Sequence, residues 1–269
     1  MPITLKIIKK PDTYLETEII TPDNFANKKL EEIKNLPIYL GNRKMKISDF
    51  FEVYDDIGKT VSETTINIEG DLSRVQRIGE KMSAGEIIIN GNVGMHLGNS
   101  MKGGKITVKG NADDWVGAMM EGGEIVIEGN AGNHCGSAYR GNWIGMTNGK
   151  IFVKGKVGVE SGAWMRSSKT YNQYPILKCG SADLYLGVHN HGGTIICEGD
   201  CEGRTGADMA SGQIIIKGKI KQMLPSFKKV EKIKEVQTPI GTIKGDFIKY
   251  IGDFSISPKP TGELYILEN

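Results

Sequence analysis

Charge of one sign, long apolar runs and regularly spaced cysteines are all scarce or missing in this chain of 269 residues. A net charge of +2 gives no electrostatic basis for binding nucleic acid. No apolar run reaches the roughly 18 residues of a membrane helix. The early charges at the N-terminus do not fit a secretory signal. The sequence therefore predicts no nucleic-acid partner and no membrane span.

Cysteine is rare, and the four cysteines have no common spacing. Zinc and iron–sulfur sites usually need paired, closely spaced cysteines, whereas disulfide frameworks belong to oxidising compartments. We therefore predict buried free thiols in a cytoplasmic protein. We also predict that this chain binds no metal and no cofactor.

Glycine is abundant, with 36 residues, and eight glycines recur at nearly regular intervals. Each has an isoleucine four residues before it, and six of them have a second glycine seven residues after it. These anchor glycines are Gly70, Gly91, Gly110, Gly129, Gly155, Gly180, Gly199 and Gly218, spaced by 21, 19, 19, 26, 25, 19 and 19 residues. A period near 19 is typical of stacked-repeat architectures.

Apolar and other residues alternate before most anchor glycines, as in a short strand with one buried face. No helical period fits between these strands. We therefore predict an all-β fold, a right-handed parallel β-helix of about seven to eight coils, because crossovers between parallel strands are usually right-handed. In this register Lys178 is an exception in an apolar column. Cys179 and Cys197 take odd and even offsets, so we expect their side chains to diverge.

The two ends of the chain depart from the repeat, and stacked sheets need caps over their unpaired edges. Residues 1–63 are predicted to form an N-terminal cap with a short helix that begins at Thr21 and a hairpin around Gly41 and Asn42. Residues 64–218 form the predicted β-helix. Residues 219–269, which contain four prolines, are predicted to be a C-terminal cap or a docking arm.

Two repeats are longer than the others, by insertions within residues 139–146 and 166–173. Such insertions become loops on one face, often the binding face. A column five residues after the anchor glycines adds polar and aromatic side chains, which form either an interface or a solvated ladder. The candidate interface residues are Trp115, His134, Arg140, Trp143, Arg166, Tyr171, Tyr174 and Arg204. His189 and His191 have no positioned acid or nucleophile beside them, and we predict no catalytic residue.

Two successive units resemble a known family. They are GNSMKGGKITVKG at residues 98–110 and GAMMEGGEIVIEG at residues 117–129. The pattern is similar to the C subunit of formylmethanofuran dehydrogenase and to the C-terminal domain of the large subunit of glutamate synthase. It covers about residues 64–218. Tyr139 and Asn190 depart from it, because they stand where the family pattern has methionine.

The resemblance implies a right-handed β-helix within a complex that reduces CO2 and forms formylmethanofuran with ferredoxin electrons in methanogenesis. This chain would then be a non-catalytic scaffold that packs against a metal–pterin catalytic subunit and an amidohydrolase-like subunit. Those partners would carry the tungsten or molybdenum pterin, the iron–sulfur clusters and a dinuclear metal centre. The alternative is a glutamate-synthase-type β-helix protein that acts with separate amidotransferase or synthase subunits. The period of 19 disfavours a hexapeptide-repeat acyltransferase.

Overall fold

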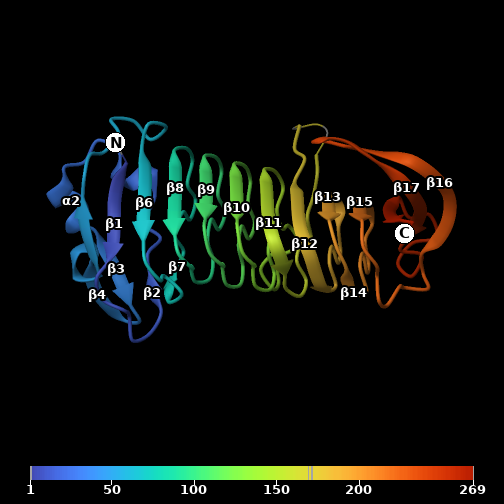
Figure 1. Cartoon of the computed structure of the whole chain (residues 1–269), viewed down its shortest axis with the longest axis horizontal. Coiled ribbons are helices and arrows are strands. Elements are labelled where there is room, and N and C mark those ends of the chain that lie inside the picture. Colours follow the sequence, from blue (N-terminus) through green and yellow to red (C-terminus); the bar gives the residue numbers. More distant parts are fainter. Residues whose placement is uncertain (1, 169, 171, 269) are drawn as a thin grey trace.

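The computed structural model describes residues 2–168, 170 and 172–268, and almost all of the regular structure is β-strand. The strands lie side by side along the molecule, with the N- and C-termini toward its opposite ends (Figure 1). The helical segments are short: α1 (Pro22–Phe25), α2 (Leu30–Lys34) and the 3-10 helix η1 (Ile47–Asp49). The prediction of an all-β fold is confirmed. No helix within the described residues combines the length and the apolar character that crossing a bilayer requires.

Eight parallel strands form the middle of a 14-stranded sheet, and each pairs with the strand of the next repeat. They are β6 (Thr65–Glu69), β8 (Glu86–Asn90), β9 (Lys105–Val108), β10 (Glu124–Ile127), β11 (Lys150–Val157), β12 (Ile176–Leu184), β13 (His191–Cys197) and β15 (Ser211–Ile216). Ile87, Ile106 and Ile125 face one another in register and are fully buried. Stacked β-branched side chains pack well on a pleated surface, so this row stabilises the pairing of the repeats.

A second line of contacts joins the repeats away from these strands. Isolated parallel bridges connect Leu72, Val93, Ala112, Ala131 and Val157 in succession. Beside them, the asparagines that directly follow three successive anchor glycines, Asn92, Asn111 and Asn130, each accept a hydrogen bond at Oδ1 from the next repeat. Asn92 accepts from the Asn111 N–H at 2.9 Å, and Asn111 accepts from the Asn130 N–H at 2.8 Å. Each repeat is therefore held to its neighbour at two places along its length.

Methionines fill one column of the interior. Six of them are fully buried: Met82, Met101, Met120, Met146, Met165 and Met209. Met146, and not Tyr139, occupies this column in its repeat, because the insertion begins before the methionine position. The Met146 carbonyl accepts from the Arg166 N–H as the Met101 carbonyl accepts from the Glu121 N–H. Asn190 does occupy the column, where its side chain bonds to the backbone of Gly193.

Gly98 illustrates why the second glycine of the repeat recurs. Its φ of +63° lies in the left-handed region, and a Cβ atom there would lie 2.6 Å from the Cδ1 atom of Ile125. A side chain at this position would both strain the backbone and displace the buried isoleucine row.

The register around β12 differs by one residue from the sequence prediction. Ile151 pairs with Leu177 and not with Ile176, and Leu177 pairs with Ile195, so the intervals are 26 and 18 residues. Lys178 therefore lies in an outward-facing row and is no exception. Cys179 pairs with Cys197, and the expectation that the two cysteines diverge is wrong. The cause is that Ile176 and Leu177 are both apolar, so the sequence permits either register after an insertion.

All four cysteines are buried and free, as predicted. Cys201 begins β14 (Cys201–Gly203), which pairs with the end of β12. Burial raises the pKa of the Cys135 thiol to about 12, because a thiolate is poorly solvated there. This thiol is inert at neutral pH.

At the N-terminal end, β1 (Ile3–Ile7) continues the parallel sheet beside β6, and β5 (Phe51–Tyr54) covers its edge in antiparallel pairing. A separate four-stranded sheet follows the order β4 (Arg43–Lys46), β3 (Pro37–Leu40), β2 (Leu15–Glu16) and β7 (Val75–Gln76). The predicted hairpin around Gly41 is β3–β4. The predicted helix start is also found, because the Thr21 hydroxyl accepts from the Asn24 N–H at the start of α1.

At the C-terminal end, β18 (Gly262–Leu267) extends the parallel sheet beside β15 and pairs in antiparallel fashion with β17 (Gly241–Gly252). The partner of β17 is β16 (Lys228–Thr238), and the sheet is therefore mixed. These two long strands arch back over the preceding repeats toward β12 (Figure 1). Val236 and Phe247 from this hairpin bury Ile196, Ile215 and Tyr265 on the outer face of the sheet.

The buried residues Ile196, Ile215 and Tyr265 belong to one row that follows the strand register along the outer face of the sheet. We call it the outer row. Its members are Ile88, Thr107, Val126, Phe152, Lys178, Ile196, Ile215 and Tyr265.

Candidate interaction surface

One column of residues defines a corner between the strands. Each backbone N–H in it donates to a carbonyl of the next repeat, and every member has a positive φ between 53° and 66°. The members of this first corner column are Arg77, His96, Trp115, His134, Glu160, Tyr185 and Arg204. Residues other than glycine rarely adopt this backbone conformation. Its recurrence means that the stacked hydrogen bonds, and the contacts between the projecting side chains, sustain it.

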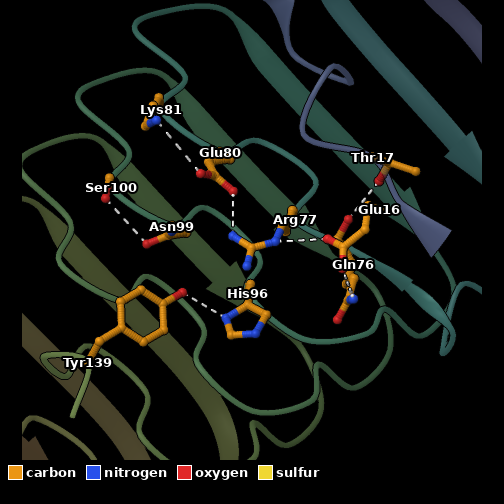
Figure 2. Close-up of polar contacts among 10 residues, drawn as sticks. All are labelled: Glu16, Thr17, Gln76, Arg77, Glu80, Lys81, His96, Asn99, Ser100 and Tyr139. Atoms are coloured by element: carbon orange, nitrogen blue, oxygen red, sulfur yellow. Dashed lines mark hydrogen bonds and ion pairs between the residues drawn. The ribbon is translucent and has the colours of Figure 1, made fainter. Parts of the chain in front are cut away.

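Four ring side chains make a stack along the first corner column. The Trp115 ring lies 4.1 Å from that of His134 and 6.4 Å from that of His96, with nearly parallel planes. Tyr139 reaches back from the first insertion, with its ring 4.8 Å from Trp115. The Tyr139 hydroxyl lies 2.7 Å from the Nδ1 atom of His96, as Figure 2 shows.

A second stack lies along a second corner column, whose members Lys81, Ser100, Met119, Trp164, His189 and Asp208 also have positive φ. The Trp164 ring stacks on His189 at 4.1 Å and on His191 at 5.6 Å. The Trp143 ring meets the Trp164 ring edge-on at 5.0 Å. The two stacks together contain all three tryptophans and all four histidines of the chain.

We name these eight rings, with the loop at residues 139–146 that joins them, the aromatic ridge: His96, Trp115, His134, Tyr139, Trp143, Trp164, His189 and His191. Tyr139 anchors one end of the loop on the first stack, and the Gly145 N–H donates to the Trp164 carbonyl at the other end. The tip carries Trp143, which is 66% exposed, and Ile144, which is 43% exposed. A fixed loop thus presents a large apolar side chain to solvent.

The structure places the predicted interface residues at different distances from this ridge. Trp115, His134 and Trp143 belong to it, and Arg140 is exposed on its loop. Arg166 is exposed, and its backbone forms a bridge with His191.

The other predicted interface residues lie apart from the rings. Arg204 lies farther along the first corner column, where its guanidinium donates to the Tyr185 hydroxyl at 2.5 Å. Tyr174 is 38% exposed after the second insertion. Tyr171 is outside the described residues.

The candidate interface residues predicted from the sequence do not include five members of the ridge: His96, His191, Tyr139, Trp164 and His189. The signal for the last two is in the repeat, because both lie nine residues after an anchor glycine, at Gly155 and Gly180. That offset is the second corner column. Tyr139 has no such signal, since an insertion carries it back to His96, 43 residues earlier.

An ion-pair network lies at the N-terminal end of the first corner column. Arg77 lies between two carboxylates (Figure 2). Its Nε atom is 2.8 Å from the Oε2 atom of Glu16, and its Nη1 atom is 3.0 Å from the Oε2 atom of Glu80. Gln76 donates to the other oxygen of Glu16 at 2.5 Å. Glu16 comes from β2, so this network fastens the N-terminal sheet to the start of the corner column.

Burial affects the charge state of four rings in the ridge. It lowers the pKa of His96, His134 and His191 below the ordinary value of 6.5, because the charged imidazolium is poorly solvated there. Burial also raises the pKa of Tyr139 to about 12. These four rings are therefore neutral at pH 7, and they stack as uncharged aromatic surfaces.

The ridge offers contact area and hydrogen-bonding groups. Exposed tryptophan and arginine beside partly buried rings are the residue types enriched at protein–protein hot spots. Within the part of the chain that the structure describes, no group of three or more His, Cys, Asp or Glu side chains is arranged to hold a metal ion. The arrangement therefore supports recognition of another protein.

Comparison with known proteins points to one family. No family model matches the chain. It is 44% identical over 257 residues to the C subunit of tungsten-containing formylmethanofuran dehydrogenase 2 from Methanococcus maripaludis, covering 93% of this chain and 91% of that one. It is 48% identical over 89 residues to the C subunit of molybdenum-containing formylmethanofuran dehydrogenase 1 from Methanosarcina barkeri, covering 33% and 30%.

A solved structure shares the fold of this chain. The chain matches one chain of the formyltransferase/hydrolase complex FhcABCD from Methylorubrum extorquens, solved in complex with methylofuran, with a TM-score of 0.87 and 27% identity. The match covers 99% of this chain and all of that one. From the long match in M. maripaludis and this shared fold we conclude that the chain belongs to the family of formylmethanofuran dehydrogenase C subunits.

Proposed function

We propose that this chain is the scaffold subunit of a formylmethanofuran dehydrogenase complex and supplies docking surfaces instead of reacting atoms. Its relatives are named as subunits of that enzyme, in tungsten and molybdenum forms. None of the named relatives is a glutamate synthase, so the alternative is not favoured. The chain would serve the reduction of CO2 to formylmethanofuran by holding its partners together.

The proposed scaffold is a right-handed parallel β-helix formed by residues 64–218. Parallel pairing of successive repeats, together with the second line of bridges, supports a coil. Its right hand is proposed because crossovers between parallel strands are usually right-handed. Residues 1–63 would cap one end, and residues 219–269 would cap the other. Columns of stacked corners would then give the rigidity that a scaffold needs.

The proposed partners are a metal–pterin catalytic subunit and an amidohydrolase-like subunit in the cytoplasm. They would carry the tungsten or molybdenum pterin, the iron–sulfur clusters and the dinuclear metal centre. This chain would bind none of these groups. The metal named for each relative supports such partners.

The observation that carries the proposal is the aromatic ridge with the Trp143 side chain at its tip. A 66% exposed tryptophan on a loop fixed at both ends is a preorganised anchor, so little entropy is lost on binding. The remaining candidates Arg140, Arg166, Tyr171, Tyr174 and Arg204 would surround this anchor or extend the contact.

Replacing Trp143 with alanine tests the proposal in the assembled complex. We expect the affinity for one partner subunit to fall by about 2 kcal/mol, or roughly 30-fold, because a buried hot-spot contact is lost. The measurement is the ratio of subunits retained on the tagged chain. The matched control is Tyr14→Ala, since Tyr14 is 45% exposed and makes none of the ring contacts of the ridge. Full retention of all subunits by Trp143→Ala would count against the ridge as a docking surface.

A further inference from the structure

The outer row is covered over only part of its length. Ile196, Ile215 and Tyr265 are at most 5% exposed, because the hairpin of β16 and β17 lies over them. Ile88, Val126 and Phe152 continue the same row but remain partly exposed. The chain thus buries one half of a continuous row with its own hairpin and leaves the other half open.

A hollow marks the end of the covered half. It has a volume of about 460 Å³ and lies between the hairpin tip and strands β11 and β12. Phe152 and Ile240 line it, together with the side chain of Lys178. Ile240 at the tip is 40% exposed. The surface of the hollow is mainly apolar, although Lys154 and Glu198 also line it. Phe152 belongs both to this hollow and to the uncovered part of the outer row.

Two ion pairs flank the uncovered half, one on each side. Lys105 pairs with Glu124 at 3.0 Å, and Lys154 pairs with Glu128. Paired charges of this kind add little attraction for a charged partner. A segment that covers the open row is therefore selected by apolar side chains, as the chain's own hairpin is.

We propose that Ile88, Thr107, Val126 and Phe152 form a docking strip for an extended apolar segment of a second subunit. The segment lies end to end with the β16–β17 hairpin and places a large apolar side chain in the hollow beside Phe152. Strands about 4.8 Å apart make the strip roughly 14 Å long, which about four extended residues span. This inference rests on the proposed scaffold function and supplies the second surface that a scaffold needs.

The double substitution Val126→Thr with Phe152→Thr tests the strip. Thr107 already occupies the same row between Ile88 and Val126, so the strands accommodate threonine there. We expect the retention of one partner subunit on the tagged chain to fall at least tenfold, with unchanged thermal unfolding of the isolated chain. The control is Ile256→Thr, which removes a 48% exposed side chain elsewhere.

The outcomes separate the two proposals. Loss of a subunit from the double variant, with none from the control, supports the strip. Loss only from Trp143→Ala overturns the strip and leaves the scaffold function standing. Full retention in both variants overturns both.

A photo-crosslinking residue at position 152 in the intact complex gives a second measurement that does not depend on the stability of the variant. An adduct with another subunit type supports the strip. Adducts confined to this chain or to a second copy of it overturn it.

Discussion

Left-handed backbone under bulky side chains is the local feature on which the candidate surface depends. Trp115 has a φ of +66° and His134 a φ of +60°, conformations that cost about 1 kcal/mol or more in an isolated residue. Each N–H in the column bonds to the next repeat, and the rings stack at 4.1 Å. The cost is thus offset only while neighbouring repeats are in place, which couples the surface to the stacking.

The histidines make the stability of the isolated chain depend on pH. Burial lowers the folded-state pKa of His96, His134 and His191, and Arg77 and Arg166 lower it further at the first and last of these. Below about pH 6.5 the unfolded chain binds more protons than the folded chain, so stability falls as the pH drops through that window. We expect the Tm to decrease from about pH 7.5 to about pH 5.5.

The double variant His96→Asn with His134→Asn is the control for this effect, because asparagine tolerates a left-handed backbone and does not titrate. Its Tm should vary less over the same range, as followed by circular dichroism. An equally steep dependence in the variant would assign the effect to other groups.

At the scale of the repeat, a disruptive substitution in the isoleucine row should also destabilise the neighbouring strands. Ile125→Asp places an unpaired carboxylate in a fully buried position between Ile106 and Ile151. We expect a loss of about 4 kcal/mol or more, with opening of several neighbouring repeats together, because each repeat contacts only its neighbours. Hydrogen exchange would show faster exchange from β9 to β11. Wild-type-like unfolding, or exchange confined to β10, would contradict the stacked core.

The repeat explains how much of the fold was predictable. Apolar alternation before most anchor glycines predicts the strands and their buried rows, because most repeats present the same local pattern. The register of β12 was not predictable, since Ile176 and Leu177 satisfy that pattern equally after an insertion of unknown shape. The fold-back of β16 and β17 depends on the packing of Val236 and Phe247 in one buried cluster with Ile215, which no local pattern encodes.

The candidate surface divides in the same way. Trp115 and His134 were predictable because both lie five residues after an anchor glycine. Trp164 and His189 carry a signal of the same kind, because both lie nine residues after an anchor glycine. Tyr139 and Trp143 lie in an insertion, where position along the chain no longer fixes position in space. Their contacts with His96 and Trp164 arise from the path of the loop.

For the molecule as a whole, the two proposed surfaces have one physical property in common. The ridge consists mainly of rings that are neutral at pH 7, and the open outer row is flanked by paired charges, in a chain of net charge +2. Burial of apolar area depends little on ionic strength, whereas contacts between exposed charges weaken as the Debye length shortens.

We therefore expect the assembled complex to keep its subunit ratio from about 0.05 M to about 0.5 M salt. The measurement is the subunit ratio on the tagged chain after washing at each concentration, with Trp143→Ala as a sensitised background. If a subunit dissociates at high salt from the unaltered chain, the exposed arginines Arg140, Arg166 and Arg204 become the dominant contacts in place of the rings. Salt dependence thus distinguishes the two classes of residue among the candidates, which substitution of one side chain at a time cannot do when both classes meet the same partner.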